Sequence, residues 1–205
     1  MAISKQKRRG IFLVPKIIRD RIADIDHILL LRKPLERPNH FRRIEPKQMT
    51  FHVVTSESEL GPLIAQFPQR ARFFREYIAN GIVAFYAMKD HAVIAYLFAT
   101  DKDFHDRHLW KNTVHVKPKE FFHFAGFVAP GSRGSIAALF VLQNAHAYFK
   151  DRGFRTAVTT VSSRNEASWR VCLKFGYDQK DQAWDVYKLF GWRWSRTVPV
   201  RIWVR

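Results

Sequence analysis

The stretch from Phe121 to Tyr177 decides the fold, and its first twenty residues, 121–140, read FFHFAGFVAPGSRGSIAALF. An aromatic, strand-like run over 121–128 leads into a turn with two glycines, and an apolar segment of helical character follows from Ile136 to Lys150. A second apolar run at 157–161 predicts another strand, and residues 165–177 predict a closing helix. The order strand, glycine turn, helix, strand, helix predicts a β-α-β-α unit.

The turn of this unit, Gly131-Ser132-Arg133-Gly134-Ser135, leads directly into the predicted helix. Backbone N–H groups at a helix N-terminus bind phosphate, and the positive end of the helix dipole assists them. We expect Gly131 and Gly134 to adopt positive φ and to allow close approach of the backbone. The guanidinium of Arg133 adds a charged donor. The turn therefore predicts a phosphate-binding site.

Two motifs carry a resemblance to a known family: V-x-P-x-x-R-G at 128–134, and N-x-x-S at 165–168 followed by K-x-G-Y at 174–177. Together they resemble the acetyl-CoA-binding core of the GNAT N-acyltransferase superfamily, most strongly over residues 118–178. The resemblance implies a single α/β (α+β) domain whose mixed, mostly antiparallel sheet is flanked by helices on both faces. It also implies acetyl-CoA or another acyl-CoA as co-substrate, and no metal.

The resemblance implies a set of donor-binding residues: Phe127, Val128, Arg133, Gly134, Ser135, Ile136, Ala138, Asn165, Ser168 and Lys174. Amides near Phe127 and Val128 would pair with the pantetheine arm, and Gly126 would permit a bulge beside them. The chain departs from the family at Ile136, which stands where a glycine is expected when the motif is counted from Arg133. Two residues keep a simpler interpretation, since Asn165 is a good helix cap and a lysine near a helix C-terminus is favoured anyway.

Acyl transfer to an amine calls for a base and an acid beside the thioester. His123, on the strand that enters the site, is the first candidate base and Glu120 the second, although a histidine in an aromatic strand is also typical of packing. The resemblance places the usual tyrosine acid seven residues after Asn165, where this chain has Cys172. Cys172 is either a thiol acid or a small buried apolar residue.

The composition limits the cellular location and the classes of partner. The chain has 205 residues, one cysteine, a net charge of +17 and a pI of about 10.4. A single cysteine excludes an intramolecular disulfide and agrees with a cytoplasmic location, with peripheral membrane association as the alternative. The positive charge favours anionic partners, namely an acyl-carrier protein, RNA or an anionic membrane surface, besides acyl-CoA and an amine acceptor. A homodimer is a further interpretation.

We expect residues 1–49 to form a basic N-terminal extension that packs on a GNAT-like acyltransferase domain at 50–205. In the extension, Ile28 to Leu31 predicts a buried strand, and isoleucines at 17, 18, 22 and 25 predict an amphipathic helix that packs on the domain or lies on a membrane. Residues 101–115 contain several His and Asp residues without metal-ligand spacing, which favours a hairpin loop over a metal site.

The C-terminal end concentrates four of the six tryptophans between residues 184 and 203. Alternating apolar residues from Val198 to Val204 predict a final strand. The tryptophans either cover the core, or suit a membrane interface, stacked bases or a sugar ring.

The sequence therefore predicts an N-acyltransferase that moves an acetyl or other acyl group from CoA to a primary amine of a small molecule or an amino sugar. Two alternatives stay within the enzyme class, namely an acyl-carrier protein as donor and aminoacyl-tRNA as acceptor. A third is a catalytically impaired GNAT-fold module that binds RNA, membrane or a protein partner, because Ile136 and Cys172 depart from the family pattern.

Overall fold

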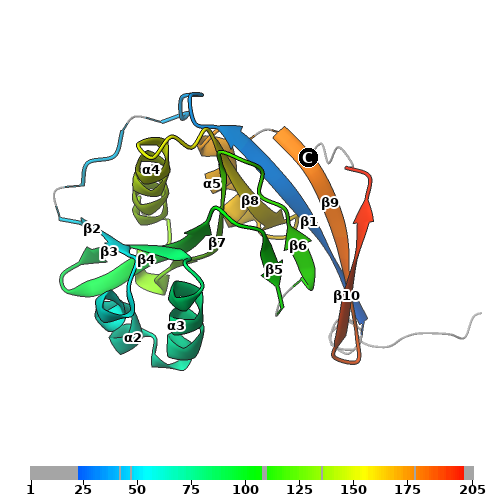
Figure 1. The fold of residues 1–205 in the computed structure, drawn as a ribbon, viewed down its shortest axis with the longest axis horizontal. Coiled ribbons are helices and arrows are strands. Elements are labelled where there is room, and N and C mark those ends of the chain that lie inside the picture. Colours follow the sequence, from blue (N-terminus) through cyan, green and yellow to red (C-terminus); the bar gives the residue numbers. More distant parts are fainter. Residues whose placement is uncertain are drawn as a thin grey trace, which may run out of the picture.

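An eight-stranded sheet organises the protein, and its order is β10-β9-β1-β8-β7-β4-β3-β2 (Figure 1). The structure is a computed structural model that describes residues 23–200 apart from 42, 47, 108, 109, 135 and 178. Its strands are β1 (Ala23–Pro34), β2 (Thr50–Val54), β3 (Val83–Lys89), β4 (Ala92–Thr100), β7 (Glu120–Val128), β8 (Thr156–Ser162), β9 (Gln179–Leu189) and β10 (Trp192–Val198). Only β7 and β8 run parallel, so the predicted mixed, mostly antiparallel sheet is confirmed.

Helices cover both faces of this sheet, as predicted (Figure 1). One face carries η1 (Glu57–Leu60), α2 (Gly61–Gln66), η2 (Pro68–Arg70) and α3 (Ala71–Ala79); the other carries α4 (Ala137–Lys150) and α5 (Glu166–Lys174). Successive side chains of β3 and β4 point to opposite faces of the sheet, so these strands contribute to two separate core clusters. Phe85 and Leu97 pack in the cluster under α4, whereas Tyr86 and Phe98 pack in the cluster under α3. A capping box of Ser56 and Glu59 begins the 3-10 helix η1.

The strand predicted at Ile28 to Leu31 is confirmed, and it lies inside the sheet. β1 pairs with β8 on one side and with β9 on the other, and all four of these residues are at most 3% exposed. Part of the predicted N-terminal extension is therefore a structural strand between β8 and β9. Ile25 also belongs to β1, so its assignment to a helix was wrong. The rest of that predicted helix lies outside the described residues.

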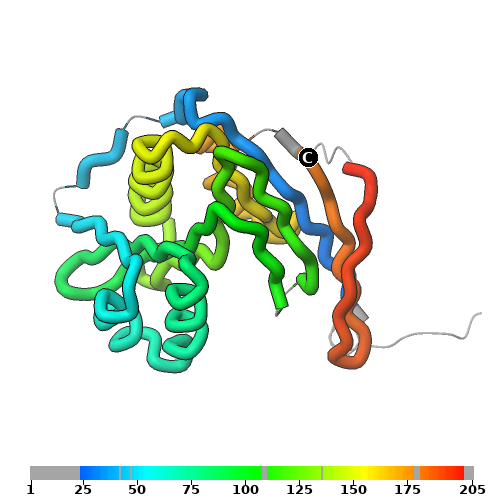
Figure 2. The backbone as a smooth tube through the Cα atoms, viewed as in Figure 1, coloured from blue at the N-terminus to red at the C-terminus, as the bar shows by residue number. Residues whose placement is uncertain are grey.

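The parallel strands β7 and β8 separate halfway along β7. They pair from Glu120–Thr156 to His123–Thr159, and beyond this point β8 continues along β1 while β7 continues along β4. A bulge interrupts the β7–β4 ladder after Phe124, as predicted, and the positive φ of 51° falls on Ala125. The tube in Figure 2 shows the two strands diverging toward their carboxyl ends.

Shorter hairpins complete the chain. Residues 101–115 form the hairpin predicted there, with β5 (Phe104–Asp106) against β6 (Asn112–Val114). At the C-terminus, Phe190 and Gly191 have φ values of 47° and 87°, which suits the tight turn between β9 and β10. The strand predicted from Val198 to Val204 lies mostly outside the described part, which ends at residue 200; β10 ends at Val198, and residues 199 and 200 are not in a strand. Trp184 is buried in the core, whereas Trp192 and Trp194 are exposed.

Candidate functional site

The end of β7 runs through a short turn into the N-terminus of α4. The turn contains η3 (Pro130–Ser132) and Gly134, whose φ of +79° confirms the predicted left-handed conformation. Gly131 lies within η3 and does not have positive φ, so that prediction was wrong, because the 3-10 turn that begins at Pro130 keeps right-handed backbone angles. Ile136 occupies the N-cap of α4, and its side chain makes no cap hydrogen bond.

The predicted donor residues at this turn are accessible. Arg133 and Gly134 are exposed, Ile136 is 43% exposed, and Ala138 on the first turn of α4 is half-buried. Phe127 and Val128 are half-buried at the end of β7, directly after the bulge. Ser135 lies outside the described residues. The segment 127–138 thus presents a strand edge, a cationic side chain and a helix N-terminus in succession.

Asn165 caps α5, where its Oδ1 accepts a hydrogen bond from the Ser168 amide at 3.0 Å. Because α5 follows β8, and β7 and β8 are parallel, Asn165 and Ser168 lie at the same sheet edge as the turn before α4. Lys174 lies at the other end of α5, about 13 Å farther along the axis at 1.5 Å per residue. Its carbonyl accepts from the His40 amide at 2.9 Å. Asn165 and Ser168 therefore join the candidate donor site, while Lys174 stands apart.

A buried cluster of polar rings lies where β7 and β8 separate. The Tyr177 hydroxyl is 2.7 Å from Nε2 of His123 and 2.8 Å from Nε2 of His146 on α4. One hydroxyl can donate to one imidazole and accept from the other, so two neutral imidazoles of opposite tautomers satisfy it. The Thr159 hydroxyl donates to the His123 carbonyl at 3.1 Å, which links the cluster to β8. All three rings lie on the face of the sheet that α4 and α5 cover.

Burial keeps this cluster uncharged near neutral pH. It lowers the pKa of His123 to about 3 and that of His146 well below its usual 6.5, and it raises the pKa of Tyr177 well above 10. A general base works best when its pKa lies near the operating pH. The environment of His123 therefore favours orientation of Tyr177 over proton abstraction from an amine.

The surroundings of the other two predicted catalytic residues, Cys172 and Glu120, favour a structural role for each. Cys172 is 6% exposed on α5, and burial raises the pKa of its thiol to about 12, which favours the packing interpretation. Glu120 begins β7 and accepts from Arg32 at 2.5 Å and from the Lys117 amide at 3.1 Å. At about 3.4 Å per residue it lies roughly 24 Å along the strand from Phe127, so its geometry favours an ion pair that anchors β7.

The opposite face of the sheet near the bulge is aromatic. Tyr96 stacks on Phe127 with centroids 5.2 Å apart, Arg70 donates to the Tyr96 hydroxyl, and the Arg70 guanidinium lies 5.6 Å from the Phe127 centroid. Tyr77 meets Phe124 edge to face at 5.4 Å. Tyr96 is 2% exposed and Phe127 is half-buried, so the Phe127 ring is the part of this pair that can contact an apolar or sugar-like group.

Sequence reasoning missed the cluster partners Tyr177 and His146, as well as Lys33. Lys33 is 1% exposed, donates to Asn39 and lines a cavity of about 250 Å³ together with His146. Burial, assisted by the charges of Arg37 and Lys150, lowers its pKa to about 8. The signal that would have found His146 is its place between Leu142 and Phe149 on the apolar side of a helix, since a buried polar ring there needs a partner.

Two further properties concern the described residues as a whole. No group of three or more His, Cys, Asp or Glu side chains among them is arranged to hold a metal ion. None of the helices in this part of the chain has the length and apolar character needed to cross a bilayer.

Comparison with solved structures finds this fold elsewhere. A Drosophila protein matches with a TM-score of 0.56 at 11% identity, over 85% of this chain and 55% of that one. The aminoglycoside N-acetyltransferase AAC(6′)-Iy in complex with CoA matches with a TM-score of 0.50 at 17% identity, over 64% of this chain and 93% of its own. An N-acetyltransferase from Staphylococcus aureus Mu50 matches with a TM-score of 0.46 at 17% identity, over 63% and 83%. No family model and no curated protein sequence matches the chain.

Proposed function

Because the chain has the fold of the GNAT N-acetyltransferases, we propose that it is a GNAT-type N-acyltransferase that transfers an acetyl or other acyl group from CoA to a primary amine. The observation that carries the proposal is the gap that opens between β7 and β8 after the His123–Thr159 pair, with the N-terminus of α4 at the same sheet edge. A strand gap suits an extended pantetheine arm, and a helix N-terminus suits a pyrophosphate.

In this proposal the donor follows the segment 127–138. The pyrophosphate lies at the N-terminal end of α4 beside the Arg133 guanidinium, while the pantetheine arm lies along the edge of β7 that β8 leaves unpaired. Gly134 provides the positive φ that the turn requires. Ile136 occupies the family's glycine position with a side chain that is 43% exposed, so it projects from the turn rather than filling it.

The proton balance of the reaction limits the role of Tyr177. The neutral amine attacks the thioester carbonyl, the C–S bond breaks, and the proton that the amine loses must replace the acyl group on the CoA sulfur. Tyr177 is fully buried, its hydroxyl is bonded to both imidazoles, and burial raises its pKa well above 10. We therefore assign Tyr177, His123 and His146 the positioning of β7 beside the gap, and the proton returns to the leaving thiolate through solvent.

The acceptor approaches from the opposite face in this scheme, beside Phe127, Tyr96 and Arg70. Aminoglycosides, the compounds that give AAC(6′)-Iy its name, are polycations, whereas this chain has a net charge of +17. Net repulsion of that kind slows the association of a polycation. The proposed acceptor is therefore a small monoamine or a monoamino sugar, for which the half-buried Phe127 ring offers a contact.

The test is thiol release from acetyl-CoA with a panel of amines that includes glucosamine, simple alkylamines and an aminoglycoside. We expect turnover that depends on the amine and is faster with glucosamine than with the aminoglycoside. Acetyl-loaded acyl-carrier protein is the comparison donor, and a preference for it would move the proposal to a carrier-protein enzyme. Acetyl-CoA that binds without thiol release on any amine would contradict the enzymatic proposal and favour a binding module.

A further inference from the structure

A buried lysine lies in the cavity between the loop that follows β1 and the C-terminal half of α4. Lys33 is 1% exposed, and its ammonium has three N–H donors, of which the Asn39 side chain takes one. Its Nζ also lies 5.7 Å from the centroid of the Phe175 ring. No carboxylate of the described residues pairs with it. Because an unpaired buried charge is costly, Lys33 lacks an anionic partner.

Two further cations line the same cavity, Arg37 in the loop after β1 and Lys150 at the end of α4. Burial, and then the charges of Arg37 and Lys150, lower the pKa of Lys33 to about 8. Arg37 has another interaction of its own, so the two lysines carry the excess charge. Glu36, the one carboxylate in the lining, is exposed and pairs with neither lysine within the described part of the chain. The cavity is therefore positive.

The neutral acceptors around the cavity are already bonded. The Gln143 side chain holds the backbone of Ile44, with its Oε1 2.9 Å from the amide nitrogen and its Nε2 3.1 Å from the carbonyl oxygen. The carbonyls of Ala147 and Lys150, at the end of α4, each accept from an amide of the following turn at 2.9 Å. The cavity measures about 250 Å³, and at about 30 Å³ for each water it has room for a small anion. The spare N–H groups of Lys33 therefore suit a ligand in this space.

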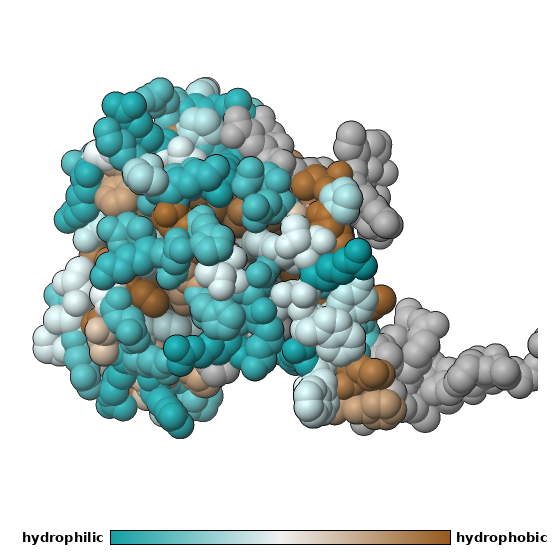
Figure 3. All heavy atoms as spheres, turned by 45° about the vertical axis from the view of Figure 1, so that its right-hand side comes forward, coloured by the Kyte–Doolittle hydropathy of each residue, from teal (hydrophilic) through white to brown (hydrophobic). Residues whose placement is uncertain are grey.

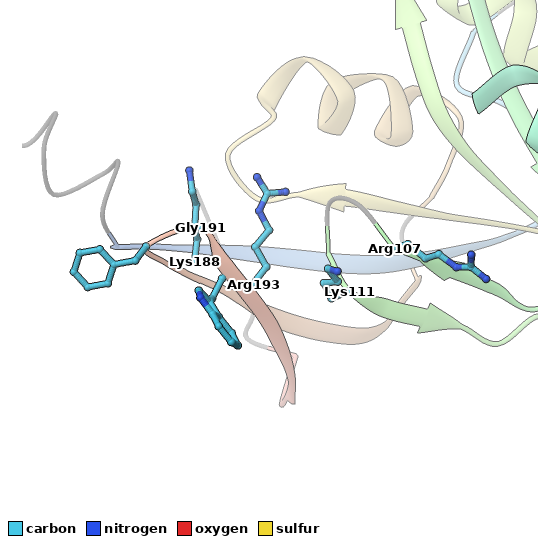
Figure 4. Close-up of a pocket in the computed structure, with 7 residues that line it drawn as sticks. Arg107, Lys111, Lys188, Gly191 and Arg193 are labelled. Carbon is cyan, nitrogen blue, oxygen red and sulfur yellow. The ribbon is translucent and has the colours of Figure 1, made fainter. Parts of the chain in front are cut away.

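A larger cavity near the tip of the β9–β10 hairpin provides a contrast. It measures about 650 Å³, and its cations are Arg107, Lys111, Lys188 and Arg193. Figure 3, which turns this side of the molecule forward, shows apolar residues gathered there next to hydrophilic ones. Figure 4 shows these cations spread along the two hairpins without converging on one point. Three of the four are exposed and Lys188 is half-buried, so water solvates their charges and the geometry favours no compact anion.

We propose that the cavity at Lys33 binds a phosphate group, carried by free phosphate or by a phosphomonoester. A lysine ammonium binds phosphate as a point charge, and a phosphate carries enough negative charge to serve both Lys33 and Lys150, whereas a monocarboxylate carries one charge. The site is separate from the proposed donor site, because Lys150 lies about 20 Å along α4 from Ala137 at 1.5 Å per residue. His146 lines the cavity and contacts the Tyr177 hydroxyl at 2.8 Å, so the phosphate would lie next to the buried cluster.

Calorimetric titration of the full chain with inorganic phosphate, at pH 7 and at an ionic strength held constant with sodium chloride, tests this site. We expect saturable binding, and a melting temperature raised by about 3–6 °C when phosphate is at ten times its Kd. Lys33→Met should weaken binding at least about tenfold, because it removes a buried charged donor. Without phosphate this variant should be at least as stable as the wild type, since an apolar side chain replaces an unpaired charge. Lys150→Gln, at an exposed position, should weaken binding about two- to fivefold.

A matched control separates the cavity from the general charge of the chain. Lys102→Gln removes one charge from an exposed position outside the cavity and should bind phosphate like the wild type. Glucose 6-phosphate is the second probe: tighter binding than inorganic phosphate supports a phosphomonoester as the ligand, and weaker binding supports free phosphate.

Phosphate should stay bound when acetyl-CoA is added in excess. Displacement by acetyl-CoA would place the anion in the donor site and overturn the proposal. Absence of saturable binding, equal affinity for acetate, or equal losses in Lys33→Met and Lys102→Gln would overturn it as well.

Discussion

The β7–α4–β8–α5 unit, residues 120–177, and the β9–β10 hairpin both combine aromatic rings with polar side chains, yet they treat them in opposite ways. In the first, Tyr177 and its two histidines are buried and bonded to one another. In the second, Phe190 and Trp192 face solvent at the tip of the hairpin, where Lys188 and Arg193 also line a cavity. The difference teaches that a residue type alone does not indicate its role, because the surroundings decide whether an aromatic ring stabilises the fold.

The largest effect expected from this contrast concerns Trp184, which lies on β9 and is 4% exposed in the core. Trp184→Ala should lower the free energy of unfolding by about 3–5 kcal/mol, since it removes a large buried side chain and leaves a cavity. Urea denaturation followed by far-ultraviolet circular dichroism measures this. A cost below about 1 kcal/mol would show that the base of the hairpin is not part of the core.

Tyr177→Phe is expected to cost about 1–3 kcal/mol of stability, because two buried imidazoles lose their shared partner. If the Tyr177 cluster also positions β7 for the reaction, kcat should fall by about 100-fold while acetyl-CoA affinity stays the same. Tyr148→Phe is the matched control, since Tyr148 is half-buried on α4 and serves as a ring against Arg152. Unchanged kcat with lowered stability would leave Tyr177 a structural role only.

The buried histidines predict a pH effect of intermediate size. The pKa of His123 is about 3 and that of His146 is well below 6.5, whereas both should lie near 6.5 in the unfolded chain. The unfolded state thus binds more protons below pH 6.5, and the free energy of unfolding should fall by up to about 1.4 kcal/mol per pH unit for each histidine. Urea titrations between pH 7 and 5 measure the slope. His146→Gln should make the pH dependence of the free energy of unfolding shallower. An unchanged slope would contradict the lowered pKa of His146 in the folded protein.

The smallest effect is expected for Trp192→Ala. Because the side chain is 79% exposed, its removal should change the free energy of unfolding by less than about 0.5 kcal/mol. The same urea assay as for Trp184 compares the two positions within one hairpin. A loss of more than about 1 kcal/mol would mean that Trp192 packs on the protein.

The regions that could be predicted from the sequence are those with a local hydrophobic periodicity or a turn motif. The aromatic strand, the glycine turn and the helix that follows have periodicity and turn chemistry that local rules can interpret, and the strand at Ile28 to Leu31 is apolar throughout because both faces of β1 are covered. The Asn165 cap was predicted for the same local reason.

Other features depend on contacts between distant segments. Tyr177 meets His123 across 54 residues and His146 across 31, and no local pattern joins them. The place of β1 between β8 and β9 is likewise a property of topology. The β9–β10 hairpin was not predicted for a local reason, since the turn at Phe190 and Gly191 lacks the Asn-Gly or Asp-Gly signature that marks most tight hairpins.

Calorimetric titration with acetyl-CoA tests the central claim, that the β7–β8 gap and the N-terminus of α4 form a donor site. We predict saturable binding by the wild type at high micromolar ligand or below, and affinity at least about tenfold weaker in Gly134→Val, because a β-branched residue at φ +79° costs about 1–3 kcal/mol and shifts the turn. Gly153→Val imposes similar strain at the other end of α4, with φ +84°, and should bind like the wild type. Absence of binding by the folded wild type, or equal affinity in Gly134→Val, would contradict the account.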